Sequence, residues 1–243
     1  MGTVLNVFAI LLGSAIGALL GNRLPEKMSR TLTDAMGLVV LVIGALNLFS
    51  LQDPEFVNAV SSAGTLLVVL GALLIGGILG SVIGIDSKLN RFGTWLQKKT
   101  SRGEGSDKEK FIQGFVNASL LFTIGPMAVL GALQDGLGQG FDVLALKSTL
   151  DGFTSVAFAA TFGWGVAFSA IPVGLWQGLL YLLALTAGAS LSQAIIASVT
   201  ATGGILLLGT GLRVLQVRMV NVADLLPSLL VAPLLVLLVD ALI

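Results

Sequence analysis

One stretch of the chain, residues 111–212, contains only four charged residues, which are Asp135, Asp142, Lys147 and Asp151. A soluble core as long as this would be interrupted by charged surface positions, so the stretch predicts several helices that cross a lipid bilayer. Charged side chains inside such helices are costly and are commonly retained for function. Lys147 and Asp151 fall within a hydrophobic run and are therefore the first candidates for a functional site.

Composition supports the same class of protein. The chain is 55% hydrophobic and 11% charged, and it contains 31 glycines, as is typical of a membrane protein with several spans. It has no cysteine and no histidine, which excludes disulfides, thiolate chemistry and His-ligated metals. We therefore expect a lipid bilayer as its surroundings, and no cofactor, metal centre or nucleic-acid partner. The first apolar run lacks a basic region and a cleavage site, so we expect it to be a retained span.

Eight hydrophobic stretches have lengths near those needed to cross about 30 Å of hydrocarbon. They cover residues 4–21, 35–51, 63–84, 111–134, 147–169, 172–189, 195–212 and 224–242. The predicted fold is therefore an all-α polytopic membrane protein with about eight transmembrane helices.

The distribution of basic residues predicts how these helices are oriented. If the eight stretches alternate in direction, twelve of the 13 Lys and Arg residues fall on one side of the membrane. The positive-inside rule makes that side the cytoplasm, so both termini are expected in the periplasm of a bacterial inner-membrane protein. Joining the fifth and sixth stretches would move Arg213 and Arg218 to the other side, so we expect a real break near Ala170–Pro172.

The third loop divides the chain into three predicted regions. Residues 1–96 contain three transmembrane helices followed by an amphipathic helix, residues 97–110 form a cytoplasmic linker rich in Gly, Ser and charge, and residues 111–243 contain five further helices. In the amphipathic helix Leu89, Phe92, Trp95 and Leu96 share one face, which is typical of a helix lying at the membrane surface. Docking of a cytosolic partner on that face is the alternative.

Glycine recurs every fourth residue in two similar stretches, at Gly13, Gly17 and Gly21 and again at Gly76, Gly80 and Gly84. Such strips let helices pack closely and make a homodimer plausible, whereas the alternative is that they line a pore. A weaker similarity relates residues 28–44 to 191–209 and residues 64–84 to 224–240. If this similarity is a true repeat, the copies are inverted in the membrane, as in many transporters.

Two neighbouring helices carry interruptions. Gly125 and Pro126 break the fourth stretch, where Asn117, Ser119 and Thr123 stand nearby, and residues 163–165 (Gly-Trp-Gly) break the fifth. Adjacent interrupted helices indicate a binding site near the middle of the membrane. The alternative is a pair of kinks whose free carbonyls are satisfied by nearby Ser and Thr hydroxyls.

The central segment also resembles a known family. The residues that carry the resemblance are 114–122, 125–131, Asp135–Gly136, 147–152, 165–170 and Gln177–Gly178, together with Gly2, Thr3 and Asn6. They resemble the bacterial membrane proteins of domain-of-unknown-function family 554 over nearly the whole chain, and the most specific part is Lys-Ser-x-Leu-Asp-Gly. Members of the family have Cys and Ala where Thr123 and Pro126 stand here, so these two are poor candidates for essential chemistry. The family implies an inner-membrane protein without an established activity.

We predict a transporter of a small solute or ion, with its site between the fourth and fifth helices. The candidate binding residues are Asp151, Lys147, Asn117, Ser119, Asp135, Ser169, Gln177 and Asn6. Lys147 and Asp151 are spaced i,i+4 and should form one unit near the outer end of a span. No phosphate loop or dinucleotide fingerprint is present, and the surroundings of Asp135 and Asp151 do not suit an aspartyl protease, so we do not expect an enzyme. A small-ion channel and a non-transporting scaffold remain as alternatives.

Overall fold

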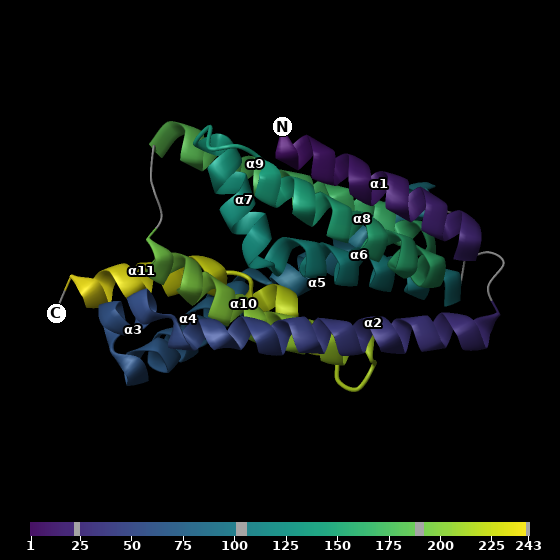
Figure 1. Ribbon diagram of the computed structural model, residues 1–243. Helices are drawn as coiled ribbons and strands as arrows, with labels where there is room; N and C mark the ends of the chain where they lie inside the picture. The colour runs from purple at the N-terminus through teal and green to yellow at the C-terminus, as the bar shows by residue number, and fades with distance from the viewer. Residues whose placement is uncertain (22–24, 101–105, 188–191, 242–243) are drawn as a thin grey trace. The chain divides into compact units, whose positions relative to one another are not determined.

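The computed structural model describes residues 1–21, 25–100, 106–187 and 192–241, and every regular element among them is a helix (Figure 1). In chain order these are α1 (Gly2–Gly21), α2 (Glu26–Asn47), η1 (Leu48–Gln52), α3 (Pro54–Val60), α4 (Ser62–Ile83), α5 (Ile85–Thr100), α6 (Ser106–Ile124), α7 (Pro126–Gly136), α8 (Asp142–Phe162), η2 (Gly163–Ser169), α9 (Ala170–Ala187), α10 (Gln193–Val214), η3 (Val222–Leu225) and α11 (Ser228–Asp240), where η denotes a 3-10 helix. The predicted all-α class is confirmed.

The chain forms two compact units, and each contains residues from both sides of the predicted linker. Unit 1 comprises Met1–Gly37, Lys88–Thr123 and Met127–Ala189, whereas unit 2 comprises Leu38–Ser87, Ile124–Pro126 and Ser190–Ile243. The first and last thirds of the chain therefore fold together within each unit.

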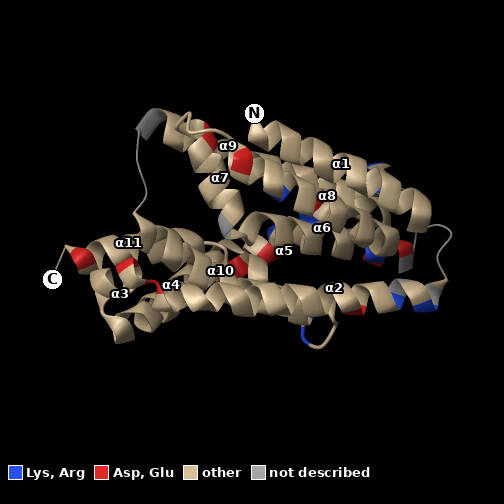
Figure 2. Cartoon of the chain, in the orientation of Figure 1, with Lys and Arg blue, Asp and Glu red and all other residues tan. Residues whose placement is uncertain are grey.

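Six helical segments of the described chain are long and apolar enough to cross a membrane, and a seventh is the bent pair α6–α7. Figure 2 shows how scarce charged residues are along α1, α4, α10 and α11. The predicted number was about eight. The difference arises because the fifth and sixth predicted stretches lie in one continuous helical segment, Asp142–Leu185, of 44 residues. The predicted break in the fourth stretch is confirmed, since α6 and α7 meet at an angle of 61°.

The direction of the chain reverses inside this long segment. A Cβ atom added to Gly2 would contact Leu144, and one added to Gly21 would contact Ala160, so α8 runs parallel to α1. The next helix returns, because Gly174 in α9 lies against Val7 near the start of α1. The interruption predicted at residues 163–165 is confirmed, since α8 ends at Phe162 and Gly163 has a φ of 73°, which suits glycine. The break predicted near Ala170–Pro172 corresponds to the start of α9 at Ala170. Pro172 occupies the first turn of α9, where its missing N–H is not needed.

Helix directions are also clear within unit 2. There α4 and α11 are antiparallel, because Gly76 faces Ser228 whereas Gly80 faces Asp224. The ion pair between Arg213 Nη1 and Asp86 Oδ1, 2.9 Å apart, joins the C-terminal end of α10 to the first turn of α5, which follows α4.

Both glycine strips make close helix contacts inside the chain. A Cβ at Gly17 would lie 2.2 Å from the carbonyl oxygen of Val156, and one at Gly80 would lie 1.9 Å from that of Asp224. The predicted role in helix packing is confirmed at these positions. Because the strips are occupied within each unit, they no longer support the homodimer that they suggested from the sequence.

The amphipathic helix is longer than predicted, and the linker is correspondingly shorter. Helix α5 continues to Thr100, and α6 already begins at Ser106, so both ends of the predicted linker 97–110 are helical. Residues 101–105 of that linker lie outside the described residues. On α5 the Trp95 side chain is 48% exposed, and the Lys99 Nζ lies 4.5 Å from the centre of its ring. An exposed Trp beside a Lys suits a helix at a membrane surface.

Candidate functional site

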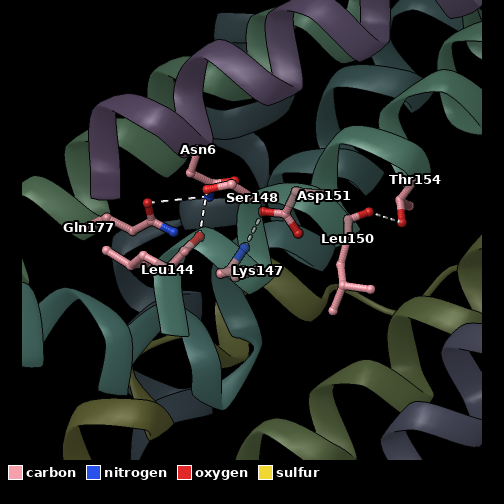
Figure 3. Close-up of polar contacts among 8 residues, drawn as sticks. All are labelled: Asn6, Leu144, Lys147, Ser148, Leu150, Asp151, Thr154 and Gln177. Carbon is pink, nitrogen blue, oxygen red and sulfur yellow. Dashed lines mark hydrogen bonds and ion pairs between the residues drawn. The ribbon is translucent and has the colours of Figure 1, made fainter. Parts of the chain in front are cut away.

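Helix α8 carries a buried ion pair. Lys147 Nζ contacts Asp151 Oδ2 (Figure 3), and the two residues are only 5% and 8% exposed. Among the described residues, they are the only buried ones that carry a charge. Helix α8 begins at Asp142, so Asp151 is about 14 Å along a helix that rises 1.5 Å per residue. The prediction that this helix begins at Lys147, with the pair near its outer end, was therefore wrong.

Local sequence explains why the pair forms. Residues spaced i,i+4 share a helix face, and the intervening Ser148 is satisfied within the helix, since its hydroxyl donates to the Leu144 carbonyl at 2.6 Å. The Lys147 Nζ also lies 5.9 Å from the centre of the Phe122 ring on α6, where a cation is attracted to the ring face. The Lys147 ammonium thus lies between the Asp151 carboxylate and the Phe122 ring, largely shielded from solvent.

Two amides from other helices complete the centre. The Asn6 Nδ2 on α1 donates to the Gln177 Oε1 on α9 at 3.3 Å. Figure 3 shows Asn6 and Gln177 close to Lys147 and Asp151 of α8. The bond between the two amides uses the Asn6 nitrogen and the Gln177 oxygen, so the Asn6 oxygen and the Gln177 nitrogen are left for other partners.

The remaining polar atoms of these amides have no partner within the chain. Asn6 Oδ1 and Gln177 Nε2 make no hydrogen bond among the described residues, although both residues are 0% exposed. A buried amide left unsatisfied costs about 1–3 kcal/mol, so such atoms call for an explanation. One is an acceptor and the other is a donor. Together with the ion pair they could bind a small polar molecule, a water or an ion.

Several buried hydroxyls in unit 1 also lack a hydrogen-bond partner among the described residues, and two of them were not predicted from the sequence. Ser14 on α1, Ser155 on α8 and Ser169 on η2 are 0% exposed, and their Oγ atoms have no hydrogen-bond partner in the described part of the chain. Ser169 was predicted from the family resemblance, but Ser14 and Ser155 were not. The i,i+4 spacing of Asp151 and Ser155 was a signal that could have identified Ser155.

The other predicted site residues have different surroundings. Asp135 caps α1, because its Oδ2 accepts from the Gly2 backbone N–H at 2.9 Å and from the Met1 amine at 2.8 Å. An anion at a helix N-terminus is stabilising, so this contact is structural. The Ser119 hydroxyl donates to the Phe115 carbonyl of its own helix at 2.5 Å. Asn117 on α6 is 3% exposed, and its Oδ1 is unpartnered.

Comparisons with known proteins give a consistent result. The family described as "Protein of unknown function (DUF554)" matches residues 1–237. "Uncharacterized membrane protein YdfK" of Bacillus subtilis (strain 168) is 32% identical over 240 residues, which cover 99% of this chain and 97% of the relative. "Uncharacterized protein YqgA" of Escherichia coli (strain K12) is 32% identical over 236 residues, covering 96% and 94%. No solved structure matches the chain.

Proposed function

The chain belongs to the DUF554 family, and we propose that it transports a small polar solute or ion across the bacterial inner membrane through the Lys147–Asp151 centre. The observation that carries the proposal is the buried pair, together with two buried amide atoms that have no partner among the described residues. Charged side chains inside a membrane protein are costly and mark substrate or ion pathways. The proposal assigns no chemical reaction to the protein.

Exchange of partners at Asp151 is the proposed step. In the paired state the Lys147 ammonium neutralises the carboxylate, and the site carries no net charge. An arriving cation or proton can replace the ammonium at Asp151, while the Asn6 and Gln177 amides supply hydrogen bonds that the chain leaves unused. Return of Lys147 then releases the ion on the other side. A small-ion channel would use the same residues without this alternation.

A non-transporting scaffold explains less of the structure. It accounts for the close backbone contacts of Gly17 and Gly80, which any tightly packed bundle needs. It gives no reason for the ion pair, because buried pairs are often no more stabilising than apolar residues of similar volume. The unsatisfied amides at the same place would add a further cost.

The proposal is tested with purified protein reconstituted in lipid vesicles. Gradients of protons, Na⁺, K⁺ and small zwitterionic solutes are applied in turn, and charge movement is recorded on a solid-supported membrane. We expect at least one gradient to produce a current above that of protein-free vesicles. If none does, and tracer uptake also stays at the protein-free level, the transport proposal fails.

We also propose that the α5–α6 connection faces the cytoplasm and that both termini face the periplasm. The clustering of basic residues supports this orientation. Since the chain has no cysteine, single cysteines at Lys98 and Asp240, and one inserted directly after Met1, can be labelled in intact cells with a membrane-impermeant maleimide. We expect the inserted cysteine and Asp240→Cys to be labelled from outside and Lys98→Cys only after lysis. Labelling of Lys98 and Asp240 from the same side would contradict this topology.

A further inference from the structure

The contact between α1 and α8 contains hydroxyls that lead away from the ion pair. Ser155 follows Asp151 by four residues, which places the two on one helix face about 6 Å apart. A Cβ added to Gly13 on α1 would lie 3.1 Å from the Ser155 Cβ, so Ser155 sits directly against α1 at Gly13, the residue before Ser14. Both hydroxyls are 0% exposed and have no partner among the described residues. One unsatisfied hydroxyl therefore lies a helical turn from Asp151, and a second belongs to the part of α1 that packs against it.

The same contact has little room for anything larger than water. A Cβ at Gly13 would come within 2.2 Å of the Gly152 carbonyl oxygen, so the two backbones touch at the level of these hydroxyls. An organic solute or a cation with several oxygen ligands needs more space than this. A hydroxyl can both donate and accept a hydrogen bond, and a single water can link such groups when it has two or more polar partners.

We propose that the ion exchanged at Asp151 is a proton, and that Ser155 and Ser14, with single waters between them, conduct it along the α1–α8 contact. This inference rests on the proposed transport function. A hydronium ion at the membrane surface gives one proton to the chain of hydroxyls and becomes water. Each hydroxyl accepts one proton and passes on its own, and the Asp151 carboxylate becomes a carboxylic acid. The Lys147 ammonium is then free to leave.

Few other charges act on Asp151. Helices α1 and η2 contain no ionisable side chain, and the only ionisable residue of α9 is Tyr181. The charged residues of α6 are at positions 107–110, near its N-terminus. The only charged residue of α7 is Asp135, which caps α1. Apart from the pair itself, the only charged residue of α8 is Asp142, its first residue. Lys147 is thus the one charged partner that contacts Asp151 among the described residues.

The test combines water access with proton flux. Ser14→Cys and Ser155→Cys, each the only thiol in its chain, are transferred to D₂O, and the exchange of S–H for S–D is followed by its infrared stretching band. Proton uptake by vesicles containing Ser14→Ala or Ser155→Ala is followed with a trapped pH-sensitive dye. Ser198 is the matched control, because it is also 0% exposed but its hydroxyl donates to the Ile195 carbonyl at 2.7 Å. All variants are first compared with the parent for expression and elution as a single species.

We expect both thiols to exchange with D₂O while the Ser198→Cys thiol does not, and each Ser→Ala change to slow proton uptake by roughly tenfold, the effect of one lost hydrogen bond. Ser198→Ala should leave the rate unchanged. Parent-like uptake in both alanine variants, or thiols that do not exchange at both positions, would show that the hydroxyls are dry packing groups and overturn the inference. If the parent moves another ion or solute but no protons, the inference fails while the transport proposal stands. If the parent moves nothing, both fail.

Discussion

Alanine at Gly17 or Gly80 is expected to lower the free energy of unfolding by about 1–3 kcal/mol, and leucine by more, as overpacking of a close contact does. A Cβ at these positions would come within 2.2 and 1.9 Å of the carbonyl oxygens of Val156 and Asp224. Both obstacles are backbone atoms, so a rotamer change cannot relieve the clash. The helices would have to separate, which also breaks the contacts of the neighbouring glycines. Thermal unfolding in detergent measures the effect.

Gly178 provides the matched control. It also lies in a membrane helix, α9, but a Cβ there would meet nothing within 4 Å. Alanine is a better helix former than glycine by about 0.5–1 kcal/mol, so Gly178→Ala should unfold at the parent temperature or slightly above it. If Gly17→Ala and Gly80→Ala are equally stable while transport changes, the strips line a pathway and the packing role is wrong.

The second large effect is expected at the ion pair. Removing one partner of a buried pair strands the other charge and typically costs about 3–5 kcal/mol, so Lys147→Met and Asp151→Leu should each destabilise strongly. The double variant Lys147→Met/Asp151→Leu removes both charges and fills the space with apolar groups. Since replacing a whole buried pair is often neutral, we expect the double variant to unfold near the parent temperature.

The single variants serve as the control for the double variant. If the two sites were independent, the loss in free energy of unfolding of the double variant would equal the sum of the losses in the two single variants. The contact between Lys147 Nζ and Asp151 Oδ2 predicts instead that the second change rescues the first. An additive result would mean that the two residues are not paired in the membrane, and the proposed exchange at Asp151 would lose its basis.

The main elements of the fold could be predicted because they depend on local properties of the chain. Hydrophobic length identified the spans, and the i,i+4 spacing identified the Lys147–Asp151 pair. The interruption at residues 163–165 was visible locally too, because glycine permits the φ of 73° that Gly163 adopts. Pro172 marked the start of α9 only approximately, since proline is tolerated anywhere in the first turn of a helix and α9 begins at Ala170.

The surroundings of the pair could not be predicted locally, because they come from distant parts of the chain. Asn6 and Gln177 are 171 positions apart, yet their side chains are hydrogen bonded, and only the family resemblance indicated either residue. The surroundings of Asp135 could not be predicted for the same reason. A charge in an apolar region suggests a binding site, but the Asp135 carboxylate accepts a hydrogen bond from the backbone N–H of Gly2, 133 positions away.

The most direct measurement of the central claim is flux through vesicles that contain Asp151→Asn. Asparagine keeps the size of the side chain and an oxygen that can accept from Lys147, so the loss of stability should be smaller than in Asp151→Leu. Flux is compared only between samples that elute as a single folded species. Asparagine cannot bind a proton or attract a cation as the carboxylate does. With the ion or solute that drives current through the parent, we predict that the Asp151→Asn signal falls to the level of protein-free vesicles. Transport at the parent rate in this variant would contradict the claim that Asp151 is the exchange site.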